Sequence, residues 1–117
     1  MKGDQGTPRI VDAKTQARYE ARAKVLKALA HPTRLFIVDE LSQSKERCVC
    51  ELTEMVGADI STVSKHLAIL KEAGIVEVEK RGAAVYYRLA VCCVPDFLTC
   101  VENVLKTNAQ QRQKVLA

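Results

Sequence analysis

The five cysteines are the residues of this chain best suited to chemistry, and they fall into two groups. Cys48 and Cys50 lie two residues apart in the stretch RCVCEL, and the second group consists of Cys92, Cys93 and Cys100. Thiolates bind soft metal ions and are readily oxidised, whereas an odd number of cysteines cannot close into a full set of disulfides. We therefore predict metal binding or redox sensing rather than a disulfide framework.

The first pair opens a segment, residues 48–56, that we predict to be a short helix because Leu52 and Val56 are spaced four apart. The turn GAD follows. Ser61 is then the expected N-cap of the next helix, since a Ser side chain accepts hydrogen bonds from the free N–H groups of a first turn. This helix carries an apolar stripe of Val63, Leu67 and Leu70. Two helices separated by a short Gly-containing turn are typical of a helix-turn-helix.

Further helices are predicted on both sides of this motif from helix-forming residues and apolar residues at helical spacing. They cover residues 10–30, residues 32–41 and the segment from Pro95 onwards. His31 and Pro32 separate the first two, because the residue before a proline avoids the helical backbone conformation. His31 is expected to be a local cap or packing residue.

Between the motif and the last helix the apolar period changes to two. Val76 and Val78 alternate with glutamates in IVEVEK, and AVYYRL alternates in the same way after Arg81 and Gly82. This pattern predicts a two-stranded β-hairpin. A helix-turn-helix followed by a hairpin is the order of a winged helix, so we predict an α+β fold that is mainly α, with four helices, a two-stranded wing and a C-terminal helix.

The composition is that of a single globular domain. The chain has 117 residues, of which 48% are hydrophobic and 27% charged, and its net charge is +4. No apolar run reaches the roughly 20 residues needed to cross a membrane, and the polar start lacks a signal-peptide core, so we expect a cytoplasmic protein. The expected organisation is a flexible N-terminus over residues 1–9, the winged-helix domain over residues 10–107 and a C-terminal tail that frays over residues 108–117.

The helix from Ser61 exposes polar side chains that suit contact with double-stranded DNA. They are Ser61, Thr62, Ser64, Lys65 and His66. Their hydroxyl, ammonium and imidazole groups suit base edges and phosphates in a major groove, and a helix N-terminus can hold a phosphate. Lys80 and Arg81 form a basic hairpin tip that can reach the DNA backbone. The alternative is a solvated helix face, but the succession of motif, hairpin and basic tip favours DNA binding.

The stretches KALAHPTRLFIVDEL, CVCEL and ADISTVSKHLAILKEAGIVEVEKRGAAVYYRL together resemble the ArsR/SmtB family of bacterial metal sensors. The resemblance covers residues 24–89 closely and the last helix by position. It implies a transcriptional repressor that is a homodimer joined by its first and last helices. It also implies that the helix from Ser61 binds an operator, and that a metal or metalloid releases it.

The resemblance places a thiolate metal site at Cys48 and Cys50. Arsenite-responsive members often carry a third cysteine three residues after the second, where this chain has Thr53. Cadmium and lead members complete the pair with amino-terminal cysteines of the other subunit, and none precedes Cys48 here. The third sulfur could be Cys92 or Cys93, or these two could form a complete set with Cys100, as in arsenite sensors that use a C-terminal cluster.

The implied inducer is As(III) or Sb(III), because three sulfurs suit these pyramidal ions, with Cd(II), Pb(II) and Cu(I) as alternatives. A zinc or nickel site is disfavoured, since the last helix offers Asp96 and Glu102 but no histidine.

Three other interpretations remain open. Cys100 on an apolar helix could be a small buried hydrophobic residue, and the paired thiols could sense oxidants or reactive sulfur instead of metals. An enzyme is disfavoured, because the chain has no Gly-rich phosphate loop and neither His31 nor His66 is placed to activate a cysteine.

Overall fold

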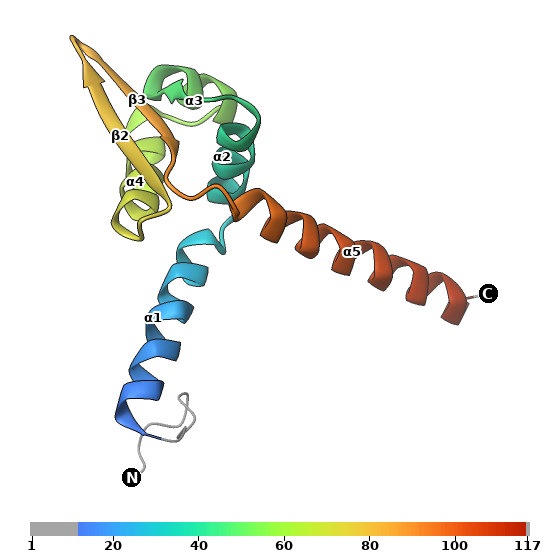
Figure 1. Cartoon of the computed structure of the whole chain (residues 1–117). Coiled ribbons are helices and arrows are strands. Elements are labelled where there is room, and N and C mark those ends of the chain that lie inside the picture. The colour runs from blue at the N-terminus through green and yellow to red at the C-terminus, as the bar shows by residue number, and fades with distance from the viewer. Residues whose placement is uncertain (1–11, 117) are drawn as a thin grey trace.

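The computed structural model describes residues 12–116 (Figure 1). Its elements are α1 (Ala13–Leu29), α2 (Pro32–Gln43), β1 (Arg47–Cys48), α3 (Val49–Val56), α4 (Ile60–Glu72), β2 (Val76–Arg81), β3 (Ala84–Leu89) and α5 (Val94–Leu116). The predicted order of helices and hairpin is confirmed, with α3 and α4 as the helix-turn-helix and β2 and β3 as the wing. The predicted flexible N-terminus, residues 1–9, lies outside the described residues.

Helices α2, α3 and α4 form the body of the molecule around an aliphatic core. Its fully buried side chains are Ile37, Val38, Leu52, Val63, Leu67 and Leu70. Removing each such side chain from water stabilises the fold by roughly 1.5–3 kcal/mol, so this core is what holds the helix-turn-helix together. The predicted stripe of α4 is therefore confirmed as its buried face.

The sheet has three antiparallel strands in the order β1-β3-β2. The wing register pairs Val76 with Leu89 at its base and Arg81 with Ala84 at its tip, where Gly82 adopts a φ of +62° that favours glycine. Strand β1, which pairs Cys48 with Tyr86, was not predicted, because two residues carry no readable period. It ties the first thiol directly to the wing.

The helix starts confirm one prediction and correct another. His31 is the N-cap of α2, where its Nδ1 accepts the Thr33 N–H at 3.1 Å. The N-cap of α4 is Asp59, not Ser61 as predicted, because the Asp59 carboxylate precedes Ser61 and accepts the Thr62 N–H at 2.8 Å. Ser61 lies within the first turn of α4.

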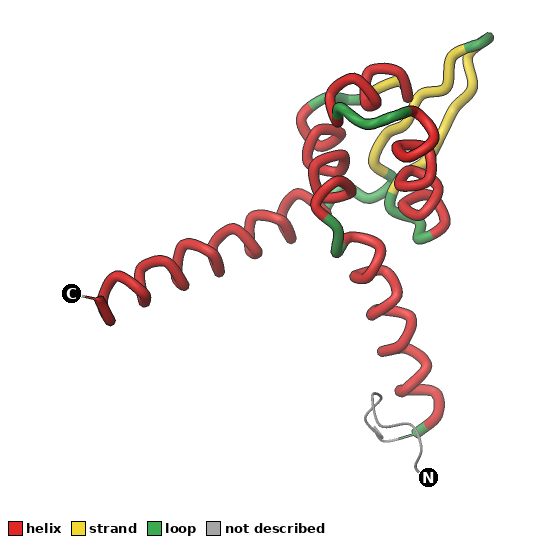
Figure 2. The backbone as a smooth tube through the Cα atoms, turned by 180° about the vertical axis from the view of Figure 1, so that it is seen from behind, coloured by secondary structure: helices red, strands yellow, loops and turns green. Residues whose placement is uncertain are grey.

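Helices α1 and α5 project from the body in different directions (Figures 1 and 2). Val94 and Leu98 pack against the core, and beyond them α5 continues as a helix to Leu116, so residues 108–116 are helical, and their fraying stays a prediction. The radius of gyration is 17.9 Å, against about 13 Å for a compact chain of this size. The chain is therefore a small packed body with two extended arms.

Among residues 12–116, none of the helices combines the length and the hydropathy that crossing a bilayer requires.

Candidate nucleic-acid interface and thiol site

The exposed face of α4 presents the side chains expected to contact DNA. Those that are exposed are Ser61, Thr62, Ser64 and Lys65. They alternate with buried residues that fix the helix on the body, so their positions are set by the core rather than by loop conformation. A rigid helix with small hydroxyls and one ammonium group in its first turns has the form of a major-groove reading element.

The start of α4 is already occupied by a carboxylate. Asp59 accepts the Thr62 N–H at 2.8 Å and the Ser61 hydroxyl at 3.1 Å. The hydrogen bonds from Thr62 and Ser61, with the Lys65 charge, lower the pKa of Asp59 from its usual 3.8, so this carboxyl is ionised at neutral pH. A negative charge here competes with a phosphate for the free N–H groups. Ser61 is therefore not the cap of α4, and its expected contact with DNA stays a prediction.

His66 is half-buried and belongs to a contact between three elements. Its Nδ1 lies 3.1 Å from the guanidinium of Arg34 in α2, and its ring centroid lies 4.4 Å from that of His31. Arg34 also donates to the Ala28 carbonyl at 2.7 Å. Because arginine can only donate, Nδ1 must be the unprotonated nitrogen of a neutral ring. Burial, reinforced by His31 and Arg34, lowers the pKa of His66 below its usual 6.5.

At the wing tip, where the sequence indicates a compact basic point, Arg81 is held in ion pairs with carboxylates. Arg81 donates to both carboxylate oxygens of Glu46, at 2.6 and 2.8 Å, and to Glu79 at 3.1 Å. Its guanidinium carbon also lies 4.5 Å from the centroid of the Tyr86 ring. These contacts raise the pKa of Arg81 and lower that of Glu46. Lys80 is exposed and makes no side-chain hydrogen bond among residues 12–116.

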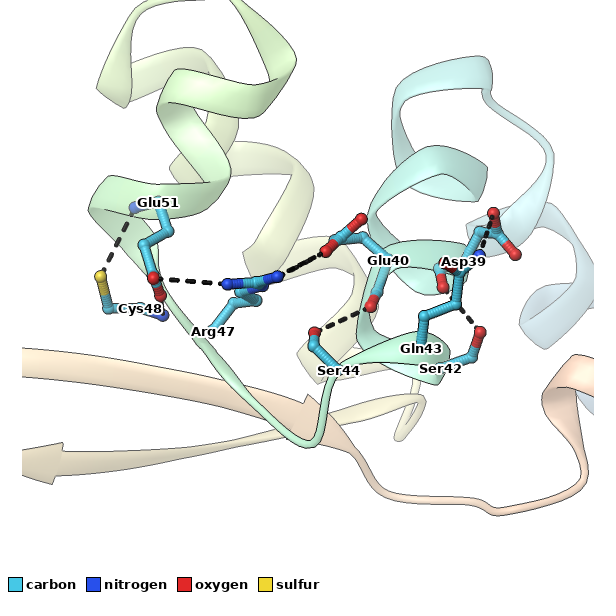
Figure 3. Close-up of polar contacts among 8 residues, drawn as sticks. All are labelled: Asp39, Glu40, Ser42, Gln43, Ser44, Arg47, Cys48 and Glu51. Carbon is cyan, nitrogen blue, oxygen red and sulfur yellow. Dashed lines mark hydrogen bonds and ion pairs between the residues drawn. The ribbon is translucent and has the colours of Figure 1, made fainter.

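Cys48 and Cys50 lie at the start of α3. Cys48 is its N-cap (Figure 3). Its Sγ accepts the Glu51 N–H at 3.4 Å, and the Glu51 carboxylate accepts the Cys48 N–H at 3.0 Å. This is a capping box with sulfur in place of the usual hydroxyl. Cys48 is buried and Cys50 is exposed. The neighbouring Cys50 thiol raises the pKa of the Cys48 thiol, and the Glu51 N–H partly opposes it.

Arg47 links α2 to α3 beside Cys48. It donates to Glu40 of α2 at 3.0 Å and to Glu51 at 3.4 Å, so that one guanidinium bridges two helices beside the cap (Figure 3).

Glu51 and Asp59 were not singled out by the sequence analysis. The signals were the glutamate three residues after Cys48 and the aspartate just before an apolar run.

The remaining three cysteines are all exposed, unlike the buried Cys48. Cys92 and Cys93 are exposed in the turn before α5, and Cys100 is exposed on α5. Within residues 12–116, no three cysteine, histidine or acidic side chains converge on a point that could hold a metal ion. The thiol donors themselves suit a soft ion. Thr53, at the position of the missing third cysteine, donates to the Val49 carbonyl at 2.7 Å.

Comparison with known proteins identifies the family. Residues 31–78, from the cap of α2 into β2, match the pattern of the family described as bacterial regulatory protein, arsR family. The chain is also 34% identical over 87 residues to an uncharacterized HTH-type transcriptional regulator of Methanocaldococcus jannaschii, a match covering 74% of this chain and 98% of that protein. The chain belongs to the arsR family.

Two further similarities describe this arsR-family chain more closely. The homodimeric winged helix-turn-helix DNA-binding domain Mb0332 of Mycobacterium bovis superposes with a TM-score of 0.75 at 33% identity, covering 86% of this chain and 93% of that one. A cadmium resistance transcriptional regulatory protein CadC homolog of Staphylococcus aureus is 43% identical over 67 residues, which cover 57% of this chain and 55% of that protein. The winged-helix fold and the regulator class are thus shared with relatives along most of the chain.

Proposed function

We propose that this arsR-family chain is a homodimeric transcriptional repressor that binds an operator. It dissociates from the operator when its cysteine thiolates bind As(III) or Sb(III). The observation that carries the proposal is the position of Cys48. Its sulfur is the N-cap of α3, the helix that packs directly before the reading helix α4. An inducer that binds this sulfur therefore competes with its role as the N-cap of α3.

The DNA contacts are assigned to the exposed side chains of α4 and the wing. Ser61, Thr62, Ser64 and Lys65 would meet base edges and phosphates in a major groove, and Lys80 would meet a backbone phosphate. His66 is engaged with Arg34, so we assign it to fixing α4 against α2 rather than to reading bases.

The homodimer is supported by the two projecting arms. Their exposed apolar side chains include Tyr19, Val25 and Leu26 on α1, and Phe97, Val101, Val104 and Leu105 on α5. Such stripes on extended helices are stabilised when a second copy covers them, and a two-fold dimer places two reading helices on one face for successive DNA grooves. The homodimeric relative supports the same assembly.

The inducer site is built on Cys48 and Cys50, which lie two residues apart at the start of α3. A third sulfur is required for As(III) or Sb(III), and the candidates are Cys92, Cys93 and Cys100 of the same or the partner subunit. The similarity to a cadmium resistance regulator keeps Cd(II) as the first alternative, ahead of Pb(II) and Cu(I).

Release follows from competition for the Cys48 sulfur. In the free protein, Sγ accepts the Glu51 N–H, and Glu51 in turn accepts from Cys48 and Arg47. A bound ion takes one lone pair of the thiolate and requires the sulfur to face its other ligands, which competes with the direction in which Sγ accepts the Glu51 N–H, so the free and bound states differ in how α3 begins. The inducer shifts the equilibrium only through its difference in affinity for these two states.

The test is operator release in an inducer screen. The purified protein is bound to DNA from upstream of its own gene and titrated with arsenite, antimonite, Cd(II), Pb(II) and Cu(I). We expect arsenite or antimonite to release the DNA at the lowest concentration. If every ion leaves the complex intact, the proposal is wrong.

A second candidate signal is oxidation, favoured by the exposure of Cys50, Cys92, Cys93 and Cys100. Exposed thiols are accessible to peroxide or reactive sulfur. Mass spectrometry after peroxide or sulfide treatment, combined with DNA binding, separates the two signals. A disulfide or polysulfide that abolishes binding, with arsenite inactive, would favour oxidation.

A further inference from the structure

One side of the wing carries a continuous network of ion pairs. Glu77, Glu79 and Arg81 follow at every second position of β2, and Arg88 of β3 donates to Glu77 at 2.8 Å and to Glu79 at 3.2 Å. The network ends at Glu46, one residue before β1, which binds Arg81 through both oxygens. Three carboxylates and two guanidiniums leave this side with a net negative charge.

Lys80 lies on the opposite side of the same strand. Side chains alternate along a strand, so Lys80 shares its side with Val76, which is buried in the core, and with the half-buried Val78. Strand β2 packs against α4, and Val76, on this side, belongs to the same core cluster as Val63, Leu67 and Leu70 of α4. The cation on the side that continues toward the reading helix is therefore Lys80, and Arg81 points the other way.

We infer that Arg81 is a positioning residue that clamps the wing to Glu46, and that Lys80 is the wing's phosphate contact. The inference rests on the proposed DNA binding and assigns the two basic residues of the tip to different tasks. Both terminal nitrogens of Arg81 already donate to carboxylates, and its plane is held by the Tyr86 ring. A phosphate would have to displace Glu46 and Glu79, leaving two carboxylates beside the DNA backbone.

The clamp would also fix the direction of the hairpin. The wing extends beyond the body, and its tip has no core residue to pack against (Figure 1). A two-stranded hairpin alone is only marginally ordered. The Glu46–Arg81 pair bridges 35 residues of sequence and fastens the tip to the segment that carries Cys48. A bidentate guanidinium–carboxylate pair restricts orientation as well as distance.

The test is a cycle of Glu46→Gln, Arg81→Gln and the double variant, with Lys80→Gln as the comparison. The double variant keeps the net charge of the wild type, so its effect is not one of overall electrostatics. Operator affinity is measured between about 50 and 200 mM salt, since each lost phosphate contact lowers the slope of log K against log salt by about 0.9.

We expect the double variant to bind roughly three- to tenfold more weakly with an unchanged salt slope, as suits a lost exposed ion pair. Arg81→Gln should add nothing in the Glu46→Gln background, and only Lys80→Gln should lower the slope. The inference is overturned if Glu46→Gln tightens binding and Arg81→Gln lowers the slope in both backgrounds, because Arg81 would then be a phosphate ligand. It is also overturned if the double variant binds as the wild type.

A second readout without DNA keeps this inference separate from the proposed function. Hydrogen exchange of the wing amides should be faster in the double variant than in the wild type, and unchanged in Lys80→Gln. If the wild type binds no DNA, the proposed function fails while the clamp is still decided by this exchange. Equal exchange in the double variant and the wild type would refute the clamp.

Discussion

Helices α4 and α5 are both amphipathic, but only α4 buries its apolar stripe within the chain. The α4 side chains that are 0% exposed are Val63, Leu67 and Leu70. The exposed α5 side chains include Val101 at 42%, Val104 at 57% and Leu105 at 56%. Burial of such a side chain contributes roughly 1.5–3 kcal/mol, which α5 gains only from another surface. The body is thus stabilised within one chain, and the arms depend on assembly.

The two groups of cysteines show the same difference between the body and the arms. Cys48 and Cys50 belong to the body, where a change at sulfur acts on α3 and its capping box directly. The second group lies next to or on α5, with Cys92 and Cys93 in the turn before it and Cys100 on the helix. The neighbours of these thiols therefore depend on what covers α5. The two groups therefore differ in whether one chain or two defines their surroundings.

The largest effect is expected from placing a charge on the exposed stripe of α5. Val104→Glu should convert the dimer to monomer and weaken operator binding at least about 100-fold, because an unpaired carboxylate would be buried in the interface at a cost of several kcal/mol. Analytical ultracentrifugation and DNA-binding titrations measure both effects. The control is Asn103→Glu, which adds the same charge on the opposite side of α5. A dimeric Val104→Glu variant would break the contrast between the helices.

The next effect compares truncations in the body and in the arm. Leu67→Ala should lower the free energy of unfolding by about 2–5 kcal/mol at any protein concentration, because it leaves a cavity in the core. The loss caused by Leu105→Ala should instead change with protein concentration, since that side chain is buried by association. Urea unfolding at two concentrations tests this. Concentration-independent losses for both would place α5 in the core of a single chain.

A smaller effect sharpens the contrast between the two groups of thiols. Cys48→Ala should destabilise the protein by about 1 kcal/mol, because α3 loses its N-cap. Cys48→Ser keeps an acceptor and should recover part of this loss. Cys92→Ala, in the exposed turn, should change the free energy of unfolding by less than about 0.5 kcal/mol. Equal losses at Cys48 and Cys92 would argue against the capping role.

The smallest effect is a pH dependence of the body. The pKa of His66 is lowered by burial and by His31 and Arg34, so below pH 6.5 the unfolded chain takes up a proton that the folded chain resists. Stability should therefore fall as the pH decreases from 6.5 toward the lower folded pKa. His66→Gln removes this contribution, and unfolding across pH 5–7 measures the difference between the two proteins. A difference that stays constant with pH would refute the assignment of a neutral ring.

The sequence predicted what depends on local period and missed what depends on distant partners. The stripe of α4 and the alternation in β2 are readable because each repeats within a few residues. The cap of α4 was placed at Ser61, although Asp59 two residues earlier is an equally good N-cap. The partners of His66 and Arg81 lie 32 and 35 residues away in sequence, so no spacing rule reveals them. The third sulfur stays a prediction, because among residues 12–116 no three candidate ligands converge.

The most direct test of the central claim is arsenite-driven operator release by two matched double variants. Cys48→Ser/Cys50→Ser should bind the operator as the wild type does, since serine keeps the cap, and should resist release at arsenite concentrations that free the wild type completely. Cys92→Ser/Cys93→Ser should weaken release without abolishing it if one of these thiols supplies the third sulfur. Release of Cys48→Ser/Cys50→Ser at the wild-type arsenite concentration would contradict the account.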